Sequence, residues 1–299
     1  MRAVVYTEHG GPDVLHVAEV EEPHAGAGQV RVAVRAAGVN PVDWKARAGM
    51  FPGDLPAIDG REAAGVVDEV GEGVDGVSAG DEVFGFTIGG GAAERVLMAD
   101  FARKPANASW EEVAGLPVAV ETSVRVFKVL GGLSAGQTIV IDGAAGGVGA
   151  AAVQLAKARG ARVIGTASER NHEFLRSLGA EPTTYGPGLA ERVRALAPDG
   201  ADLGFDTAGK GGVRELIELT GDPARVASIA DWGAADLGVK VTGGAGAERA
   251  EEALGEAAEL IEAGRFSLPV AQTFRFAQAA EAHRVSEAGH VRGKLVLIP

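Results

Sequence analysis

The 299 residues suffice for about two domains, and a composition of 46 % hydrophobic and 23 % charged residues is typical of a soluble globular protein. No apolar run approaches the roughly 20 residues that cross a bilayer, and the net charge of −13 argues against nucleic acid or an anionic membrane as main partner. The absence of cysteine excludes disulfides, thiolate nucleophiles and thiolate zinc sites.

The first part of the chain, to about residue 110, predicts a β domain. Its opening residues, Met1–Tyr6, run straight into a strand pattern with no signal-peptide segment, which favours a cytoplasmic protein. Short apolar or alternating runs, broken by Gly and Pro as at Pro52-Gly53, are typical of strands. The predicted strands are Arg2–Tyr6, Val14–Val20, Val30–Ala37, Ala64–Val70, Asp81–Phe86 and Ala93–Ala99.

From about residue 110 to residue 264 the pattern becomes strand–helix alternation. Ser109 is a good N-cap for a helix from Trp110 to about Val129, because the glutamates at 111 and 112 complement the helix dipole. Strands are predicted at 138–142, 162–166, 181–184, 201–207, 225–229 and 238–242. Helices are predicted at 148–159, 170–178, 189–197, 212–219 and 247–263. This alternation favours an open, doubly wound parallel sheet.

The last segment, residues 265–299, returns to a β pattern and is expected to rejoin the N-terminal domain. The predicted fold is therefore α/β, with one domain formed by residues 1–112 and 265–299 and a second by residues 113–264. Gly238–Thr242 would be an edge strand of the parallel sheet, and an unpaired edge favours a homodimer. Lys240 could instead protect that edge.

The most informative motif is the glycine-rich turn that follows the strand at 138–142. Residues 144–149 read Ala-Ala-Gly-Gly-Val-Gly, a dinucleotide-binding fingerprint with alanine in its first glycine position. Backbone N–H groups at the start of a helix are unpaired and attract a diphosphate. Gly146, Gly147, Val148 and Gly149 would hold it, with Gly146 letting the backbone approach the ligand and Gly149 letting the helix approach the strand.

The tip of the next strand should carry the residue that selects the ribose. An NAD enzyme usually has a carboxylate there, which accepts a hydrogen bond from the 2′-OH. This chain has Ala167-Ser168-Glu169-Arg170. With Ala167 in the selecting position, Ser168 and Arg170 can donate hydrogen bonds to a 2′-phosphate, which favours NADP(H). In another register Glu169 would occupy that position.

Several motifs in order resemble a known family. They are Ala36-Ala-Gly-Val-Asn-Pro-Val-Asp-Trp-Lys45, Gly60-Arg-Glu-Ala-Ala-Gly-Val-Val67, Gly80-Asp-Glu-Val-Phe84, the glycine-rich turn and Gly293-Lys-Leu-Val296. The chain resembles the zinc-free quinone oxidoreductases (zeta-crystallin-like) of the medium-chain dehydrogenase/reductase superfamily. The resemblance implies a GroES-like β domain plus a Rossmann domain. It also implies NADPH-dependent reduction of quinones or other activated, electron-poor alkenes.

The resemblance also implies that no catalytic zinc is bound. Asn40 stands where zinc-dependent relatives have their first thiolate, and Arg61 precedes Glu62 where those relatives have a His-Glu pair. A protonated guanidinium does not ligate zinc. None of the six histidines has a partner at the i, i+4 spacing of a helical metal pair.

Without a metal, reduction needs an acceptor that is already electrophilic and hydrogen-bond donors aimed at its oxygen. Asn40 is the first candidate donor and Lys45 the second. The alternatives are a turn residue before Pro41 for Asn40 and a solvated surface role for Lys45. Asp43 is expected to cap the short helical turn after Pro41. Glu62 could orient its neighbours or pair with Arg61.

Further cofactor contacts follow from the resemblance alone. Thr122 would place its hydroxyl near the nicotinamide or its phosphates, Tyr185 would contact the adenosine phosphate region, Gly209 would admit the nicotinamide ribose, and Lys294 would return with the tail toward the cofactor. The alternatives are a bond from Thr122 back into its own helix, packing for Tyr185, a plain turn for Gly209 and a solvated strand end for Lys294.

The substrate is less defined. Residues 87–94 lack the aromatic side chains that many relatives carry there, so Trp44 and Trp232 are the candidates for lining the pocket. The expected partner is a small electron-poor acceptor. An enoyl-thioester reductase of acyl or polyketide metabolism, or a non-catalytic cofactor-binding protein, remain alternatives.

Overall fold

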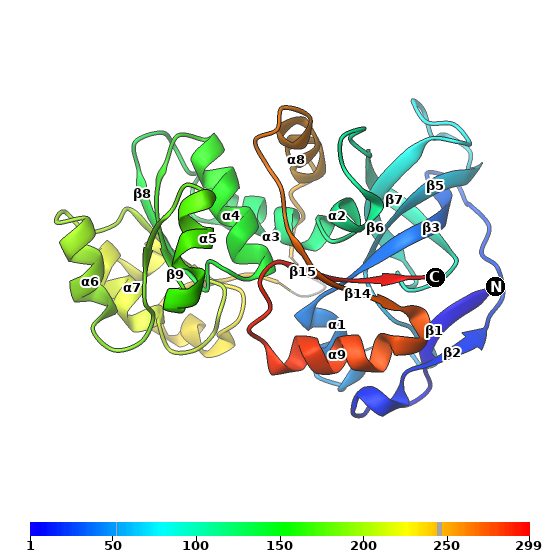
Figure 1. Cartoon of the computed structure of the whole chain (residues 1–299), viewed down its shortest axis with the longest axis horizontal. Coiled ribbons are helices and arrows are strands. Elements are labelled where there is room, and N and C mark those ends of the chain that lie inside the picture. Colours follow the sequence, from blue (N-terminus) through cyan, green and yellow to red (C-terminus); the bar gives the residue numbers. More distant parts are fainter. Residues whose placement is uncertain (52, 244–246) are drawn as a thin grey trace. The chain divides into compact units, whose positions relative to one another are not determined.

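The computed structural model describes residues 1–51, 53–243 and 247–299, and the chain divides into two compact units (Figure 1). The first unit comprises Met1–Val118 with Leu254–Pro299, and the second comprises Ala119–Ala253. Pro52, one of the predicted strand breaks, lies outside the described residues. No helix in the described ranges is both long and apolar enough to traverse a bilayer.

The first unit contains a ring of antiparallel strands. Its members are β3 (Val30–Val39), β5 (Glu62–Val70), β6 (Glu82–Ile88) and β7 (Arg95–Arg103). The ring closes because β3 pairs with β5 along one edge and with β7 along the other. Two C-terminal strands, β15 (Lys294–Ile298) and β14 (Val270–Arg275), extend the sheet from β3. The last segment of the chain therefore pairs with strands of its first part.

A second, three-stranded sheet and several short helices complete the first unit. The sheet has the order β2-β1-β4, with β1 (Arg2–Tyr6), β2 (His16–Glu19) and β4 (Ala57–Ile58). The helices are η1 (Pro12–Val14), α1 (Pro41–Arg47), α2 (Trp110–Ala114), α8 (Ala253–Glu262), η5 (Phe276–Gln278) and α9 (Ala279–Ala288).

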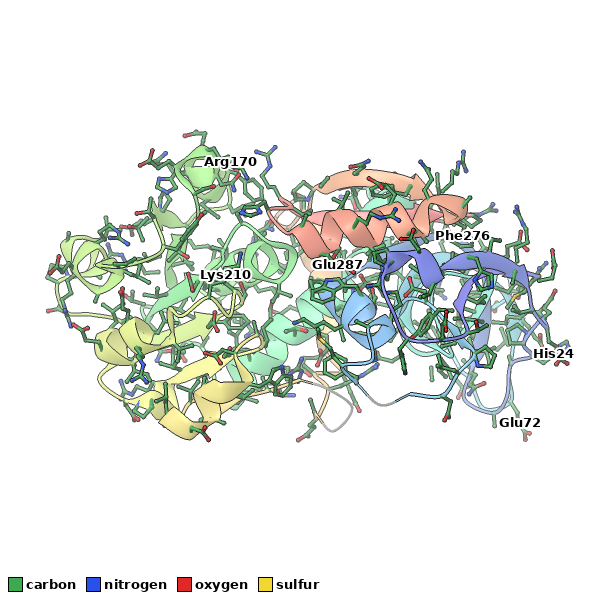
Figure 2. The ribbon with its side chains drawn as sticks, turned by 90° about the horizontal axis from the view of Figure 1, so that it is seen from below. His24, Glu72, Arg170, Lys210, Phe276 and Glu287 are labelled. Carbon is green, nitrogen blue, oxygen red and sulfur yellow. The ribbon has the colours of Figure 1, made fainter. Side chains whose placement is uncertain are left out.

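Two ion pairs with buried members link α9 to the rest of the first unit, besides an exposed pair between Arg284 and Asp13. Arg47, buried at the end of α1, pairs with Glu287 of α9, which Figure 2 labels. His283 of α9 lies 2.9 Å from the Asp59 carboxylate, and both side chains are buried. These pairs hold α9 against the segment that contains α1.

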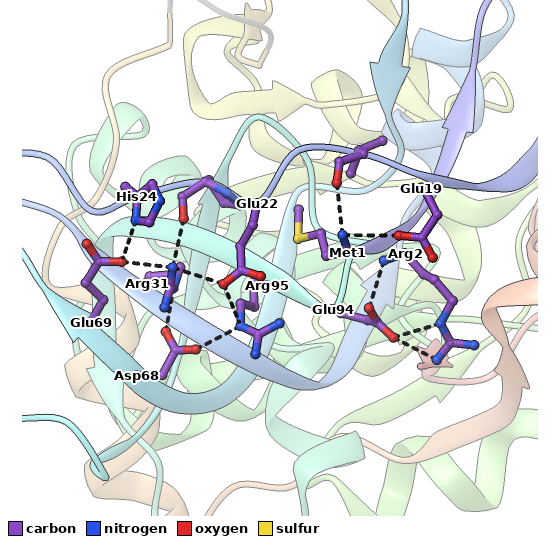
Figure 3. A network of polar contacts seen from close by, with 12 residues as sticks. Met1, Arg2, Glu19, Glu22, His24, Arg31, Asp68, Glu69, Glu94 and Arg95 are labelled. Carbon is purple, nitrogen blue, oxygen red and sulfur yellow. Dashed lines mark hydrogen bonds and ion pairs between the residues drawn. The ribbon is translucent and has the colours of Figure 1, made fainter.

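The outer surface of the β strands carries a network of ion pairs, drawn in Figure 3. Arg31 of β3 contacts Asp68 and Glu69 of β5, and Arg95 of β7 contacts Asp68 and Glu22. Partly exposed pairs of this kind contribute about 0–1 kcal/mol each, so the network links neighbouring strands without dominating stability.

The second unit is built on six parallel strands. They are β8 (Thr138–Asp142), β9 (Arg162–Thr166), β10 (Glu181–Thr183), β11 (Leu203–Asp206), β12 (Val226–Ser228) and β13 (Lys240–Val241). Their order in the sheet is β10-β9-β8-β11-β12-β13. This order confirms the predicted doubly wound sheet, with the topological switch between β8 and β11.

Helices cover both faces of this sheet (Figure 1). On one face, Val140 and Ile164 share a hydrophobic core with Leu189 of α6 (Leu189–Leu196) and Leu216 of α7 (Val213–Thr220). The opposite face receives α4 (Gly147–Ala158) and α5 (His172–Ser177). Three 3-10 helices complete the unit: η2 (Glu169–Asn171), η3 (Pro223–Arg225) and η4 (Trp232–Leu237).

Two helix predictions need correction. The single helix expected from Trp110 to about Val129 is two helices, α2 and α3 (Pro117–Val129), because Pro117 lacks an N–H and disfavours helical geometry before it. The Ser109 cap itself is confirmed, since its hydroxyl accepts a hydrogen bond from the Glu112 N–H at 3.2 Å. The helix expected over 247–263 is α8, which begins only at Ala253.

The sequence does not predict helix α9, because residues 265–299 have a β pattern overall. The buried face of α9 consists of Ala279, Ala282 and His283. Small or polar side chains at these positions produce no periodic pattern of large apolar residues, which is the main sequence signal for a helix.

Candidate dinucleotide and catalytic sites

The turn between β8 and α4 has the geometry that phosphate binding requires. Gly146 is the N-cap of α4, and the first intrahelical bond runs from the Ala150 N–H to the Gly146 carbonyl at 2.8 Å. The N–H groups at positions 147–149 therefore belong to the first turn, where a helix leaves donors unpaired. These donors fit a diphosphate.

Gly149 and Gly146 are glycine for two different steric reasons. A Cβ at Gly149 would lie 2.4 Å from the carbonyl oxygen of Gly143, so a side chain there would push α4 away from the turn. A Cβ at Gly146 would meet nothing closer than 3.5 Å, so the outer side of that residue is open to a ligand. Gly149 thus serves packing, and Gly146 leaves room for an approaching phosphate.

The loop after β9 carries the residues expected to select the ribose. Strand β9 ends at Thr166, and Ala167, the first residue beyond it, is buried. Ser168 is half-buried and is the N-cap of η2, whereas Glu169 and Arg170 are exposed. Arg170 projects from the surface of the second unit (Figure 2). The side chains next to the strand end therefore include a hydroxyl and a guanidinium.

The loop after β10 contains Tyr185, whose side chain is 56 % exposed. The guanidinium of Arg192, on α6, donates to the carbonyl oxygens of Thr184 at 3.0 Å, Tyr185 at 3.3 Å and Gly186 at 3.0 Å. It also donates to the carbonyl oxygen of Pro187 at 2.8 Å. Sequence reasoning missed this positioning role of Arg192, because nothing in the sequence shows that one side chain meets four carbonyls.

Gly209 follows β11 with φ +63°, a conformation that favours glycine, and a Cβ there would lie 2.9 Å from the backbone of Ala230. The loops that carry the glycine turn, Ser168 and Arg170, Tyr185 and Gly209 follow β8, β9, β10 and β11. These strands are neighbours and parallel, so all four loops lie at the carboxyl edge of one sheet.

Thr122 lies elsewhere, on α3, and is buried. Its hydroxyl accepts a hydrogen bond from the Arg125 side chain at 3.3 Å, so it bonds within its own helix through a side chain. Its neighbour Ser123 donates to the carbonyls of Ala119 at 2.7 Å and Val148 at 3.2 Å. Ser123 therefore connects α3 to the first turn of α4, a role that the sequence does not reveal.

In the first unit, Asn40, Glu62 and Lys294 form a buried triad. The Asn40 amide nitrogen donates to Glu62 Oε1 at 2.7 Å, and Lys294 Nζ lies 3.1 Å from the same oxygen. Lys294 Nζ also donates to the Asn40 amide oxygen. The three residues are 3 %, 0 % and 5 % exposed, so the ammonium and carboxylate neutralise each other away from solvent.

The second oxygen of Glu62 accepts a hydrogen bond from the Val118 N–H at 2.7 Å, in the first turn of α3. Two glycines make room for the triad: a Cβ at Gly38 would lie 2.0 Å from Glu62 Oε1, and one at Gly115 would lie 3.0 Å from the Lys294 side chain. Lys294 thus contacts Asn40 and Glu62, and is not a solvated strand end.

Asp43 caps α1 as expected, since its carboxylate accepts a hydrogen bond from the Asn40 N–H at 2.7 Å. Burial, with a contribution from the charge of Asp59, raises the pKa of Asp43 to about 7. The guanidinium of Arg61 lies 3.8 Å from Asp43. Arg61 is therefore next to Asp43, whereas Glu62 pairs with Lys294.

The other candidates from the sequence lie outside the triad. Lys45 is half-buried on α1, with its ammonium 5.6 Å from the ring centre of Trp44. The indole nitrogen of Trp44 is buried without a hydrogen-bond partner among the described residues. Trp232 opens η4 in the second unit and is 49 % exposed, and a Cβ at Gly243 would lie 3.4 Å from its ring.

The donor set does not fit a zinc ion. Within residues 1–51, 53–243 and 247–299, no three His, Asp or Glu side chains come together in a way that could hold a metal. Asn40 and Glu62 are instead bonded to the ammonium of Lys294.

Comparison with known families assigns the chain. The family model of the alcohol dehydrogenase GroES-like domain matches residues 26–197, and the model of zinc-binding dehydrogenases matches residues 178–297. The chain belongs to the medium-chain dehydrogenase/reductase superfamily. The expected resemblance to this superfamily is confirmed.

The relatives of this chain differ in length, so the chain covers different shares of them. It is 36 % identical to a phenolphthiocerol synthesis polyketide synthase type I from Mycobacterium marinum, over 93 % of the chain but 14 % of that protein. It is 33 % identical to the 2-methylene-furan-3-one reductase of Solanum lycopersicum and to the chloroplastic NADPH-dependent alkenal/one oxidoreductase of Arabidopsis thaliana. The alignments with these two reductases cover the whole chain and 79 % and 80 % of the relatives. The chain therefore spans only a small part of the polyketide synthase.

Solved structures agree with the family. An NAD-dependent alcohol dehydrogenase superposes with a TM-score of 0.88 at 32 % identity, covering all of both chains. A quinone oxidoreductase from Coxiella burnetii gives 0.85 at 29 % identity, covering 100 % of this chain and 99 % of that one. A mycobacterial protein solved as a complex with NADPH gives 0.85 at 27 % identity over all of both chains. The predicted combination of a GroES-like β domain and a Rossmann sheet is confirmed.

Proposed function

We propose that the chain is an NADP(H)-dependent oxidoreductase that delivers hydride to quinones or other activated alkenes, such as enones, without a catalytic metal. Residues 1–112 with 265–299 form its catalytic domain, and residues 113–264 form its dinucleotide-binding domain. The observation that carries the proposal is the open glycine turn at the start of α4, at the same sheet edge as Ser168 and Arg170.

The cofactor residues divide by role. The N–H groups at positions 147–149 bind the diphosphate, and Gly146 lets it approach. Ser168 and Arg170 bind a 2′-phosphate, because Ala167 presents no carboxylate to repel it. Tyr185 contacts the adenosine end and Gly209 admits the second ribose. Thr122 contacts the nicotinamide or its phosphates from α3, next to Ser123, whose hydroxyl donates to the Val148 carbonyl in the first turn of α4.

NADPH preference is consistent with two of the relatives. The Arabidopsis alkenal/one oxidoreductase is named as NADPH-dependent, and the mycobacterial structure contains NADPH. The alcohol dehydrogenase that superposes on the chain is named as NAD-dependent, so the fold alone does not decide between the cofactors. The residues after β9 favour NADPH.

The metal-free mechanism rests on the triad. Asn40 and Glu62 stand at the positions that the resemblance matches to zinc-site residues, and the Lys294 ammonium lies between them. When bound, the reduced nicotinamide supplies the hydride to an electron-poor carbon, and charge develops on the oxygen of the acceptor. Asn40 keeps one amide N–H and Lys294 one ammonium N–H beyond their bonds within the triad, and these donors stabilise that oxygen. Lys45 is the second candidate donor, and Trp44 and Trp232 contact the acceptor.

The test measures NADPH and NADH oxidation with a small quinone, an enone and a crotonyl thioester. We expect turnover with the quinone or the enone, a preference for NADPH, and no loss of activity after dialysis against a metal chelator. Asn40→Ala should lower kcat by about 100-fold, as removal of one oxyanion donor does, with the Kd for NADPH unchanged. Activity that chelation abolishes and zinc restores would refute the metal-free mechanism.

A second candidate function is enoyl-thioester reduction. It is favoured by 36 % identity to polyketide synthases, including the pikromycin synthase component of Streptomyces venezuelae. Preference for the crotonyl thioester over the enone and the quinone would support it. Tight NADPH binding with no turnover on any acceptor would instead indicate a non-catalytic cofactor-binding protein.

The proposed assembly is a homodimer that pairs along β13, the edge strand next to β12. The Lys240 ammonium donates to the carbonyl of Val129 at 2.7 Å, so it is held within its own unit and does not guard the edge. Light scattering should give the mass of two chains, and Val241→Pro, which removes an edge N–H, should give the mass of one.

A further inference from the structure

The four central strands of the parallel sheet end in polar side chains. Thr166 ends β9, Asp142 ends β8, Asp206 ends β11 and Ser228 ends β12. Asp206 pairs in register with Asp142 on one side and with Ser228 on the other. The four residues, called here the edge row, are between 0 % and 4 % exposed.

The side chains of the edge row bond to one another in two pairs. The Thr166 hydroxyl donates to Asp142 Oδ1, and the Ser228 hydroxyl donates to Asp206 Oδ2 at 2.6 Å. Two residues earlier on their strands, Val140, Ile164 and Val226 point into the hydrophobic core under α6 and α7. Side chains two apart on a strand share a face, so the edge row forms a polar rim on that apolar layer.

The same side chains accept hydrogen bonds from the loops that follow the strands. Thr166 accepts the Gly143 N–H at 3.1 Å, where the glycine turn begins. Asp206 Oδ1 accepts the N–H groups of Ala208 at 2.9 Å and Gly209 at 2.8 Å. Ser228 accepts the N–H of Asp231 at 2.9 Å, in the loop before η4. The edge row thereby holds the loops that follow β8, β11 and β12.

Asp142 and Asp206 are adjacent buried carboxylates, and hydrogen-bond donors stabilise their negative charges. The pKa of Asp142 is raised overall, because burial and the charge of Asp206 raise it more than the hydrogen bond from the Thr166 hydroxyl lowers it. Each carboxylate has a hydroxyl donor on the side away from the other one. This arrangement separates the two charges and leaves Asp206 as the acceptor of three hydrogen bonds.

We propose that Asp206 and Thr166 are positioning residues for the dinucleotide, because they hold the Gly209 loop and the start of the glycine turn in their binding conformations before the cofactor arrives. The inference rests on the proposed NADP(H) function. Neither side chain touches the cofactor in this account. Their contribution is preorganisation of backbone groups, which raises affinity by lowering the cost of ordering the loops on binding.

The test compares Asp206→Ala, Thr166→Val and Thr166→Ser in the full-length protein. Thr166→Val removes the hydroxyl and keeps the shape of the side chain. Thr166→Ser keeps the hydroxyl and removes the methyl group. The matched control is Thr220→Val, since the Thr220 hydroxyl bonds to the Leu216 carbonyl at 3.0 Å at the other end of α7. NADPH affinity is measured by fluorescence titration, and amide hydrogen exchange of residues 143–149 and 207–209 is measured without cofactor.

We expect Thr166→Val to raise the Kd for NADPH by about tenfold, because it leaves the Gly143 N–H without its acceptor, and Asp206→Ala, which removes three hydrogen bonds, to raise the Kd by at least as much. Loop exchange should be faster in both variants, while Thr166→Ser and Thr220→Val should stay within about twofold of wild type. The KM for a quinone should not change. A purely structural role would lower thermal stability equally in Thr166→Val and Thr220→Val without changing the Kd.

Two results overturn the inference, and they are distinguishable. If the wild-type protein binds NADPH and Thr166→Val and Asp206→Ala bind it equally well, with unchanged loop exchange, the edge row does not position the loops. If the wild-type protein binds no NADPH at all, the proposed function fails and the inference fails with it.

Discussion

The substitution Glu62→Gln tests the buried triad. The carboxylate accepts from Asn40 at 2.7 Å, faces Lys294 at 3.1 Å and accepts from the Val118 N–H at 2.7 Å. An amide has one oxygen and one NH2 group. In one orientation the NH2 faces the Val118 N–H, and in the other it faces the ammonium and the Asn40 amide. Either way two donors face each other, and Lys294 loses its counter-ion.

The expected loss of stability follows from this geometry. Leaving one member of a buried ion pair without its partner costs about 3–5 kcal/mol. In a domain of roughly 150–250 residues, one kcal/mol corresponds to roughly 2–4 °C. We therefore expect the melting temperature of the first unit to fall by roughly 6–20 °C, with a parallel loss in the free energy of unfolding by urea.

The control is Glu82→Gln, because Glu82 pairs with Lys104 at 3.1 Å with its side chain 50 % exposed. That change should cost less than about 1 kcal/mol. The double variant Glu62→Gln/Lys294→Met removes both charges, and it should be at least about 2 kcal/mol more stable than the sum of the single effects predicts. Additive single effects, or a Glu62→Gln protein as stable as Glu82→Gln, would refute the account of the triad.

Three further predictions concern the glycine turn before α4, the loop after β9 that is expected to select the ribose, and the pH dependence of stability. Gly149→Ala should raise the Kd for NADPH by more than about tenfold in a fluorescence titration, because its Cβ would lie 2.4 Å from the Gly143 carbonyl oxygen; an unchanged Kd would contradict the placement of the turn. Arg170→Glu should lower kcat/KM for NADPH by about tenfold and leave that for NADH unchanged in steady-state assays, and equal losses would count against 2′-phosphate binding. Burial lowers the pKa of His283, but the hydrogen bond and charge of Asp59 outweigh it, so the pKa is raised above 6.5. The His283–Asp59 pair therefore stabilises the fold fully below pH 6.5, and this stabilisation is lost as the pH rises through the raised pKa. His283→Gln should lower the free energy of unfolding in urea more at about pH 5.5 than at about pH 8.5. A loss of the same size at both pH values would show that the pair is not charged.

Local features of the fold were predictable from the sequence. The glycine turn, the Ser109 cap and the strand–helix alternation depend on residues that are close in the chain, so their patterns survive in the sequence. Pro117 was visible as well, but the apolar pattern from Trp110 to Val129 favoured one continuous helix. In α9 the alanines at 279 and 282 gave no apolar pattern to detect.

The triad and the edge row could not be predicted in this way. Asn40 and Lys294 are 254 residues apart, and only the pairing of β15 with β3 brings them together. Asp142, Asp206 and Ser228 each end a different strand, and their contacts depend on strand order and register. The expectation for Asn40 as a donor came from family resemblance, and its bonds to Glu62 and Lys294 came only from the structure.

The two outer strands of the parallel sheet differ in what they offer a neighbouring molecule. On β10 the middle residue is Pro182, which has no N–H to give and interrupts any ladder built on that side. On β13 both residues retain their amide protons. In the proposed homodimer the two β13 edges would pair with each other about a twofold axis, and Pro182 would keep β10 from adding a further copy by strand pairing.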